Sequence, residues 1–304
     1  MAAPPAEASL AKLVYDHQGF AVAEDGTRLF YGVLGSGPLV VLNDGIGCDG
    51  FAWKYIQPEL ARDHTVVHWH YRGHGRSGLP RDRARLDIPA IARDLTAVLA
   101  KVDKDLDVNG EAILMGHSMG TQVCLEYDRL FRHRTRAHVL LCGSYGKVTE
   151  TFHGSDVLKQ VLPTLIEQVQ RRRGLARALW GRVSPTVAFR FASMSGEIDA
   201  LNIQQEDFET YWEHINLMDP DIFLPMLRGA GEHSAEDFLT SVDVPTLVIA
   251  AERDTFTPSE LAQSMADRIP GGEFTLLRGA SHAAPIEHPD TIIARIREFL
   301  EQRL

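Results

Sequence analysis

Three residues of the types that can carry out nucleophilic catalysis follow one another along the chain. Ser118 is the central residue of GHSMG (116–120), which fits the pattern G-x-S-x-G, and Asp254 and His282 follow it. A serine hydroxyl becomes an effective nucleophile when a histidine takes its proton and an acid orients that histidine. These residue types make Ser118 a candidate nucleophile, His282 a candidate base and Asp254 a candidate orienting acid.

The GHSMG motif is informative mainly because of the strand and helix patterns that flank it. Three fixed positions of common residues recur by chance in about one chain in ten of this length. Here the motif follows an apolar run (112–115) and begins a stretch of helical spacing (119–131). A sharp strand-to-helix turn would strain the serine and lift its hydroxyl to the carboxyl end of a sheet, beside a helix N-terminus. The alternative is an ordinary serine in such a turn.

The acid and the base each follow an apolar run that reads as a strand. Asp254 comes after LVIAAE (247–252), and His282 comes after FTLLRG (274–279). Carboxyl ends of parallel strands share one edge of a sheet, so we expect both side chains beside the serine. The alternatives are a turn-shaping Asp and a surface His. Weaker candidates for acid or base are Asp243, Glu252 and His288.

Strand and helix patterns alternate along most of the chain and indicate what positions these residues. Strand patterns cover 19–23, 27–35, 38–43, 64–70, 111–116, 137–143, 244–252 and 272–279, and helical patterns cover 53–60, 88–99, 119–131, 259–268 and 292–300. This alternation predicts an α/β fold with a mostly parallel sheet flanked by helices. Asp25-Gly26 between the first two strands predicts a hairpin.

One long segment interrupts the alternation. Residues 144–240 have no convincing strand pattern, and helical spacing dominates there, for example in 157–169 and 208–218. We therefore expect a core formed by 1–143 and 241–304, with a helical insertion over 144–240.

With these features together, the chain resembles the α/β-hydrolase superfamily, in the branch with a helical cap. The resemblance spans nearly the whole length and rests on GHSMG, RGHGRSG (72–78), ERDTFTP (252–258) and GASHAAPIEHP (279–289). It implies the α/β-hydrolase fold, with an eight-stranded, mostly parallel sheet and an inserted cap. It also implies a covalent acyl-enzyme route that uses no cofactor and no metal.

The resemblance further implies an oxyanion hole made by the backbone N–H groups of Met119 and Ile46. The loop of Ile46 has Asp44 where the family usually has His, and His70 stands where the family usually has Asp. Because a reversed pair keeps a polar contact, we expect Asp44 and His70 to touch and brace this loop. The alternative is two unrelated substitutions. A metal site of Asp44, His68 and His70 is a weaker hypothesis, since the serine chemistry needs no metal.

The apolar and aromatic insertion is expected to roof a pocket over the serine. Our candidates for its lining are Phe191, Met194, Trp212 and Met218, which would suit a small hydrophobic acyl substrate. The favoured function is hydrolysis of a carboxylic ester, a lactone or a thioester. Two alternatives use the same side chains, namely carbon–carbon bond hydrolysis and cofactor-free perhydrolysis. A third is a non-catalytic ligand receptor, which the unusual Asp44 leaves open.

Composition bounds the remaining possibilities. The 304 residues include 31 Lys or Arg and 41 Asp or Glu, a net charge of −10, which argues against nucleic-acid and anionic-membrane partners. No apolar run approaches the roughly 20 residues of a membrane-spanning helix. The three cysteines, Cys48, Cys124 and Cys142, lack paired spacing, so we expect reduced thiols and a cytoplasmic protein. The sequence leaves the oligomeric state open.

Overall fold

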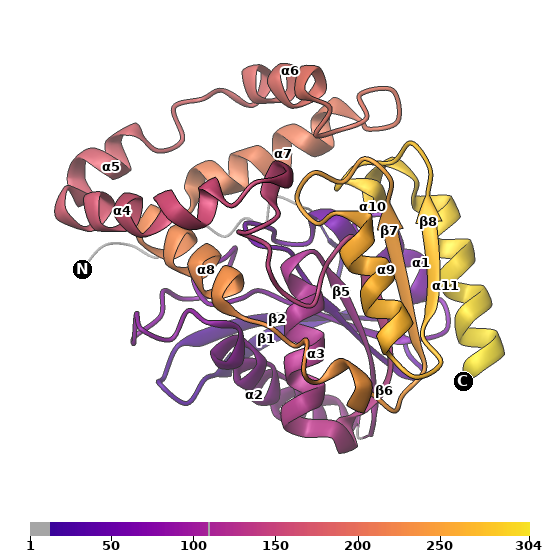
Figure 1. Cartoon of the computed structure of the whole chain (residues 1–304). Helices are drawn as coiled ribbons and strands as arrows, with labels where there is room; N and C mark the ends of the chain where they lie inside the picture. Colours follow the sequence, from indigo (N-terminus) through magenta and orange to yellow (C-terminus); the bar gives the residue numbers. More distant parts are fainter. Residues whose placement is uncertain (1–12, 109) are drawn as a thin grey trace.

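An eight-stranded sheet forms the centre of the molecule (Figure 1). The computed structural model describes residues 13–108 and 110–304. The strands are β1 (His17–Val22), β2 (Arg28–Leu34), β3 (Leu39–Asn43), β4 (Thr65–Trp69), β5 (Ala112–His117), β6 (Thr135–Leu141), β7 (Thr246–Ala251) and β8 (Glu273–Leu277). Their order in the sheet is β1-β2-β4-β3-β5-β6-β7-β8. The predicted hairpin is present as β1 and β2, which pair antiparallel, as do β2 and β4, while all later pairs are parallel.

Helices cover both faces of this sheet. In chain order, the helices of the described residues, both those on the sheet and those between β6 and β7, are α1 (Ile56–Leu60), α2 (Ile88–Leu106), α3 (Met119–Phe131), α4 (Val157–Arg171), α5 (Arg173–Leu179), α6 (Pro185–Ser195), α7 (Gln205–Leu217), α8 (Pro220–Glu232), α9 (Ser259–Arg268), α10 (Ala284–Glu287) and α11 (Pro289–Arg303). Buried residues of α2, α3 and α9 belong to one apolar cluster with the sheet, and those of α1 and α11 belong to another. The result is the three-layer arrangement that alternating strands and helices predict.

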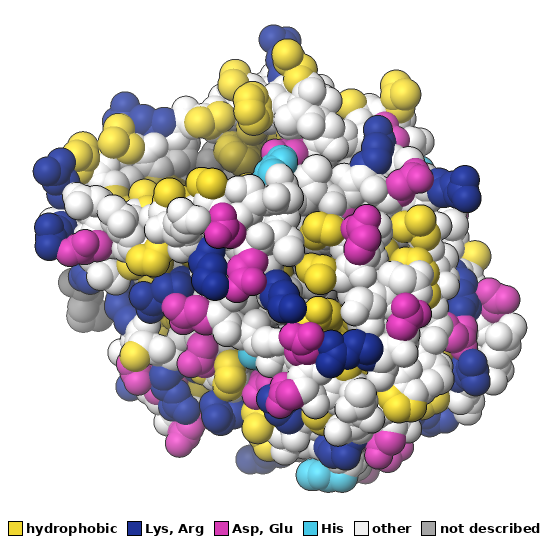
Figure 2. Space-filling view, in the orientation of Figure 1, with side chains coloured by type: hydrophobic (Ala, Val, Ile, Leu, Met, Phe, Trp, Pro, Cys, Tyr) yellow, Lys and Arg dark blue, Asp and Glu magenta, His cyan; other side chains and the backbone are white. Residues whose placement is uncertain are grey.

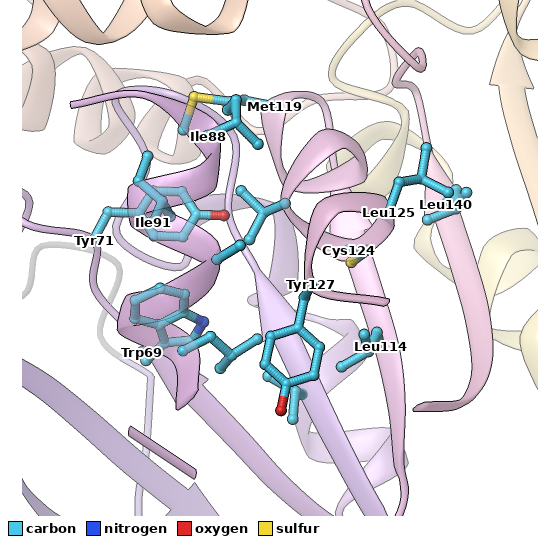
Figure 3. Packing of buried hydrophobic residues seen from close by; sticks show 14 of the residues in the cluster. Trp69, Tyr71, Ile88, Ile91, Leu114, Met119, Cys124, Leu125, Tyr127 and Leu140 are labelled. Carbon is cyan, nitrogen blue, oxygen red and sulfur yellow. The ribbon is translucent and has the colours of Figure 1, made fainter. Parts of the chain in front are cut away.

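The strands near the middle of the sheet are apolar on both faces because both faces are covered. In β3, Val41 packs into the cluster on the α2 and α3 side, and its neighbour Val40 packs into the cluster on the α1 and α11 side. Figure 3 shows the first cluster, where Trp69 lies at the end of β4 and Ile91 lies on α2. Continuous burial explains why these strands appear as unbroken apolar runs in the sequence.

The segment between β6 and β7 is described in full and contains helices α4 to α8, with no strand beyond a single bridge between Gly146 and Ser234. Figure 1 shows α4 to α7 above the layers of the core. Among the described residues, no helix combines the length and the apolar character needed to cross a lipid bilayer.

Candidate active site

Ser118 lies in the sharp turn where β5 ends and α3 begins. Its backbone angles are φ 54° and ψ −119°, a conformation that residues with a side chain rarely adopt. The Ser118 amide donates to the carbonyl of Leu141 at 3.0 Å, and the Ser118 carbonyl accepts from Thr121 N at 3.0 Å. The surrounding hydrogen bonds therefore hold the serine in a strained position at the carboxyl end of β5.

The two glycines of the GHSMG motif allow this turn for steric reasons. A Cβ on Gly116 would lie 2.4 Å from the carbonyl oxygen of Gly120, and one on Gly120 would lie 2.2 Å from that of Asn43. Both distances are far below van der Waals contact. The motif is thus required by the close passage of α3 against β5 and the end of β3.

His282 links the serine to Asp254. Its Nε2 lies 3.0 Å from Ser118 Oγ, and its Nδ1 lies 2.8 Å from Asp254 Oδ2. Because an ionised carboxylate only accepts hydrogen bonds, Nδ1–H donates to Asp254, and Nε2 is left as the acceptor for the Ser118 hydroxyl. Three residues from the loops after β5, β7 and β8 thereby meet at one edge of the sheet.

The Asp254 carboxylate is ionised because several donors surround it. Burial by itself would raise its pKa, but His282 and the Thr257 hydrogen bonds hold the pKa below its usual value. The amides of Phe256 and Thr257 both donate to Asp254 Oδ1 at 2.8 Å, and the Thr257 hydroxyl lies 2.8 Å from Oδ2. The segment ERDTFTP therefore supplies both the acid and the groups that keep it charged.

Glu287 holds the residue before the base. Its Oε1 accepts from the Ser281 hydroxyl at 2.5 Å, and its Oε2 accepts from the Ser281 amide at 2.9 Å. Oε1 also accepts from the Asp199 amide at 2.6 Å, so the same carboxylate joins the loop of His282 to the insertion. The sequence analysis missed Glu287, although it lies within the quoted segment GASHAAPIEHP.

The loop after β3 passes directly beside the nucleophile. A Cβ on Gly45 would lie 3.1 Å from Ser118 Cβ. The amides of Ile46, in this loop, and Met119, the first residue of α3, donate no hydrogen bond to any other described residue. The absence of a protein acceptor is compatible with the predicted role of these two amides as oxyanion donors.

Asp44 contacts a different histidine from the one predicted. Its Oδ2 accepts from His68 Nε2 at 2.8 Å, and His68 Nδ1 lies 2.8 Å from the Tyr15 hydroxyl. His70 instead accepts from the Arg76 amide at 2.8 Å through Nδ1, and its ring packs on Phe30 with centroids 4.7 Å apart. The prediction that Asp44 pairs with His70 is therefore wrong, because Asp44 pairs with His68 instead.

The reason lies in how the strands separate. Leu42 pairs with His68 in the parallel register of β3 and β4, so a continued ladder would place Asp44 opposite His70. The chain after β4 instead stays paired with β2, where the His70 amide donates to the Phe30 carbonyl at 3.0 Å.

Burial has the largest influence on the pKa of the Asp44 carboxyl and raises it, even though His68 opposes that shift.

The four proposed pocket residues have different environments. Met218 is buried, and Trp212 packs within the insertion, where its indole N–H donates to the Val183 carbonyl at 2.9 Å. Phe191 and Met194, by contrast, are 69% and 88% exposed. They do not form a buried roof, because α6 packs through its alanines instead. The buried residues of α6 are Ala188 and Ala192.

Exposed apolar side chains recur between residues 157 and 217 of the insertion, and apolar side chains are visible on the surface there in the space-filling view (Figure 2). The insertion nevertheless reaches the site through α7 and α8. A Cβ on Gly47 would lie 3.1 Å from Ile215 and 3.3 Å from Phe223. At the other end of the insertion, the ring of Phe152 lies edge-on to Phe256, with centroids 5.0 Å apart.

Within the described residues, no group of three or more His, Cys, Asp and Glu side chains is arranged to hold a metal ion.

Comparison with known proteins gives a consistent result. A sequence model of the alpha/beta hydrolase family matches residues 39–295. The polyketide synthase ThaQ of Burkholderia thailandensis is 26% identical over 274 residues, which are 89% of this chain but 12% of that synthase. The pyrrolizixenacetamide deacetylase of Xenorhabdus hominickii is 28% identical over 280 residues, covering 90% of this chain and 94% of that protein.

Among solved structures, a thermophilic esterase from Thermogutta terrifontis superposes with a TM-score of 0.75. The superposition covers 94% of this chain and 98% of the esterase, at 24% identity. At that level of identity, the similarity is one of fold.

Proposed function

The chain belongs to the alpha/beta hydrolase family, and from this premise we propose that it is a serine hydrolase acting on a carboxylic ester, a lactone or a thioester. The observation that carries the proposal is the continuous series of contacts from Ser118 Oγ through His282 to Asp254. Each distance is within hydrogen-bond range, and the order of the groups is that of nucleophile, base and orienting acid.

In the first half of the reaction, Ser118 Oγ attacks the acyl carbon while His282 Nε2 takes the hydroxyl proton. The electron pair of the carbonyl moves to its oxygen, and the amides of Ile46 and Met119 stabilise the negative charge. When the carbonyl re-forms, the bond to the leaving oxygen or sulfur breaks. His282 gives its proton to the leaving group, and the acyl group remains on Ser118.

In the second half, a water molecule attacks the acyl-enzyme. His282 takes a proton from the water and then returns it to Ser118 Oγ as the bond between serine and acyl carbon breaks. The product is a carboxylic acid, and the resting state of the enzyme is restored. Asp254 stabilises the positively charged imidazole that forms in both halves.

The substrate we propose is a small molecule with a hydrophobic acyl part. The apolar side chains near the site support this, because Ile215 and Phe223 lie beside Gly47 in the loop after β3, and Phe256 contacts both the His282 ring and Phe152. Apolar surroundings also exclude water from the charge that develops at the acyl oxygen.

A fluorophosphonate probe, which reacts with activated serines, tests the proposal directly. We expect the wild-type protein to be labelled and Ser118→Ala to remain unlabelled. Ser264→Ala, which changes a serine of α9, is the matched control and should label like the wild type. A wild-type protein that never reacts would favour a non-catalytic ligand receptor.

A substrate panel then defines the bond that is cleaved. It contains p-nitrophenyl esters of increasing acyl length, a lactone, a thioester and an acetamide, the last because the Xenorhabdus relative is named a deacetylase. We expect fastest turnover of a short or medium acyl ester. Activity confined to a vinylogous diketone, or to peracid formation from hydrogen peroxide and acetate, would replace ester hydrolysis by the corresponding alternative reaction.

A further inference from the structure

Gly47, in the loop after β3, is held at both of its backbone polar groups by histidines. Its amide donates to His74 Nε2 at 3.1 Å, and its carbonyl accepts from His214 Nδ1 at 2.7 Å. Its φ of 75° lies in the left-handed region, so the loop takes a conformation that suits glycine. Two imidazoles from different parts of the fold therefore fix one peptide segment.

His214 comes from the insertion, on helix α7, and is 4% exposed. Its second nitrogen, Nε2, accepts from the Gly75 amide at 3.0 Å. Both ring nitrogens are thus used, Nδ1 as the donor and Nε2 as the acceptor. One side chain consequently joins α7, the loop after β3 and the loop after β4.

The segment that His214 holds is directly connected to the reacting atoms. Gly47 follows Ile46, whose amide is one of the two proposed oxyanion donors, and Gly45 on the other side passes against Ser118. A donor must lie within a few tenths of an ångström of its place to stabilise the developing charge. The orientation of the Ile46 amide therefore depends on how firmly Gly47 is held.

We propose that His214 is a positioning residue of the oxyanion loop. It does not touch the substrate. It fixes Gly47, and so aims the Ile46 amide, only when α7 is packed on the core. The inference rests on the proposed hydrolase function and adds that the insertion takes part in the chemical step as well as covering the site.

Helix α7 provides a matched control, because a second buried polar residue also ties it to the core. Asp207 is 3% exposed, forms an ion pair with Lys54, and accepts from the Tyr55 hydroxyl at 2.7 Å. This residue lies seven positions before His214, about two helical turns away. Asp207 secures the same helix through Lys54 and Tyr55, which come after the short helical turn Phe51–Trp53 and are separated by it from Gly47.

The experiment compares four variants with the wild type, using the p-nitrophenyl ester that the panel selects. His214→Leu removes both contacts and His214→Gln keeps only an acceptor toward Gly75. His214→Asn keeps only a donor toward Gly47, because its amide nitrogen takes the place of Nδ1. Asp207→Asn is the control for docking of α7. All variants are also assayed for binding of a trifluoromethyl ketone, whose serine adduct carries an oxyanion.

The expected pattern distinguishes positioning from docking. His214→Leu and His214→Gln should lower kcat by about ten- to a hundredfold, with KM within about twofold of the wild type. Their affinity for the trifluoromethyl ketone should fall by the same factor as kcat/KM. His214→Asn should recover most of the activity. Asp207→Asn should lower the melting temperature while kcat stays near that of the wild type.

Two results would overturn the inference while leaving the hydrolase function intact. One is an equal loss of kcat in His214→Leu and Asp207→Asn, and the other is a change confined to KM. Amide hydrogen exchange of residues 44–50 gives a readout that does not depend on activity. Exchange in His214→Leu should be faster than in the wild type and in Asp207→Asn, and unchanged protection would refute the positioning role even if no ester is hydrolysed.

Discussion

The ring of Phe256 lies against the imidazole of His282, with ring centroids 4.8 Å apart and an interplanar angle of 29°. Phe256 is two residues after Asp254, so one short loop supplies both the acid that bonds to His282 and the surface that supports its face. The imidazole is thereby fixed along its edge by a hydrogen bond and across its plane by packing.

This packing leads to a prediction for Phe256→Ala. Removing the ring leaves the imidazole free to rotate about its hydrogen bond to Asp254, so kcat should fall by about tenfold. Phe256→Leu, which keeps apolar bulk against the ring, should lose less. Steady-state kinetics on the selected ester measure both, and equal kcat values in Phe256→Ala and the wild type would show that the hydrogen bond alone orients the base.

Asp254→Asn tests the acid. An amide cannot stabilise the imidazolium and favours the wrong tautomer of His282, so kcat should fall by about 10⁴-fold. Glu252→Gln is the matched control, since Glu252 lies two residues before Asp254 and its side chain accepts from the Gly279 amide at 2.8 Å. Its kcat should remain near that of the wild type. If the two variants showed the reverse effects, Glu252 would be the acid.

The buried ion pair of Arg72 and Asp94 predicts a large effect on stability. Arg72 Nε donates to Asp94 Oδ2 at 2.7 Å and Nη2 donates to Oδ1 at 2.5 Å, and both side chains are buried. Asp94→Ala leaves a buried guanidinium without its main partner and should lower the free energy of unfolding by about 3–5 kcal/mol.

The control for this change is Asp237→Ala, which removes one of the partners of Arg129 at the surface. Because the Asp237 side chain is 77% exposed, we expect a change of about 0–1 kcal/mol. Urea unfolding at neutral pH measures both. A loss of similar size in the two variants would mean that Arg72 finds other partners once Asp94 is removed.

Two buried histidines predict that acid destabilises the fold. Burial lowers the pKa of His74 and of His117 from 6.5 to about 3, with smaller contributions from His214 and His282, respectively. In the unfolded chain both imidazoles take up protons near pH 6.5, whereas in the folded chain they stay neutral down to about pH 3. The unfolded state binds more protons in that window, so stability is greatest above pH 6.5 and falls as the pH is lowered toward 3.

Urea unfolding at pH 7, 6, 5 and 4 tests this dependence. In His117→Asn, the slope of unfolding free energy against pH should decrease by the amount that corresponds to about one proton taken up on unfolding. His133→Asn changes an exposed histidine and should leave this slope unchanged. Identical slopes in all three proteins would show that His117 is protonated in the fold.

The parts of this molecule that the sequence predicts are those that local patterns determine. Strands buried on both faces must be continuously apolar, and the close passage at Gly116 and Gly120 requires glycine, so both leave a visible signature. The helices predicted over 119–131 and 259–268 coincide with α3 and α9. The positions of Ser118, Asp254 and His282 after three strands were enough to predict that they meet.

Contacts that depend on the path of the backbone after a strand ends were not predictable from local patterns. Asp44 bonds to His68 because the chain after β4 remains paired with β2 instead of following β3. The outward face of α6 carries Phe191 and Met194 because small alanines form its packed face, a choice that helical spacing alone does not reveal. His214 is one histidine in an amphipathic helix, and its hydrogen bonds to the backbone of Gly47 and Gly75 depend on tertiary contacts that helical spacing does not show.

The strained backbone of Ser118 lowers the stability of the fold. Its angles are ones that glycine adopts without strain, whereas a residue with a side chain is destabilised there by about 1–3 kcal/mol. A Ser118→Gly protein should therefore melt at a higher temperature than the wild type while being inert toward esters. Stability alone would favour glycine at this position, so under the proposed function the strain at Ser118 is the cost of holding its hydroxyl in the attacking position.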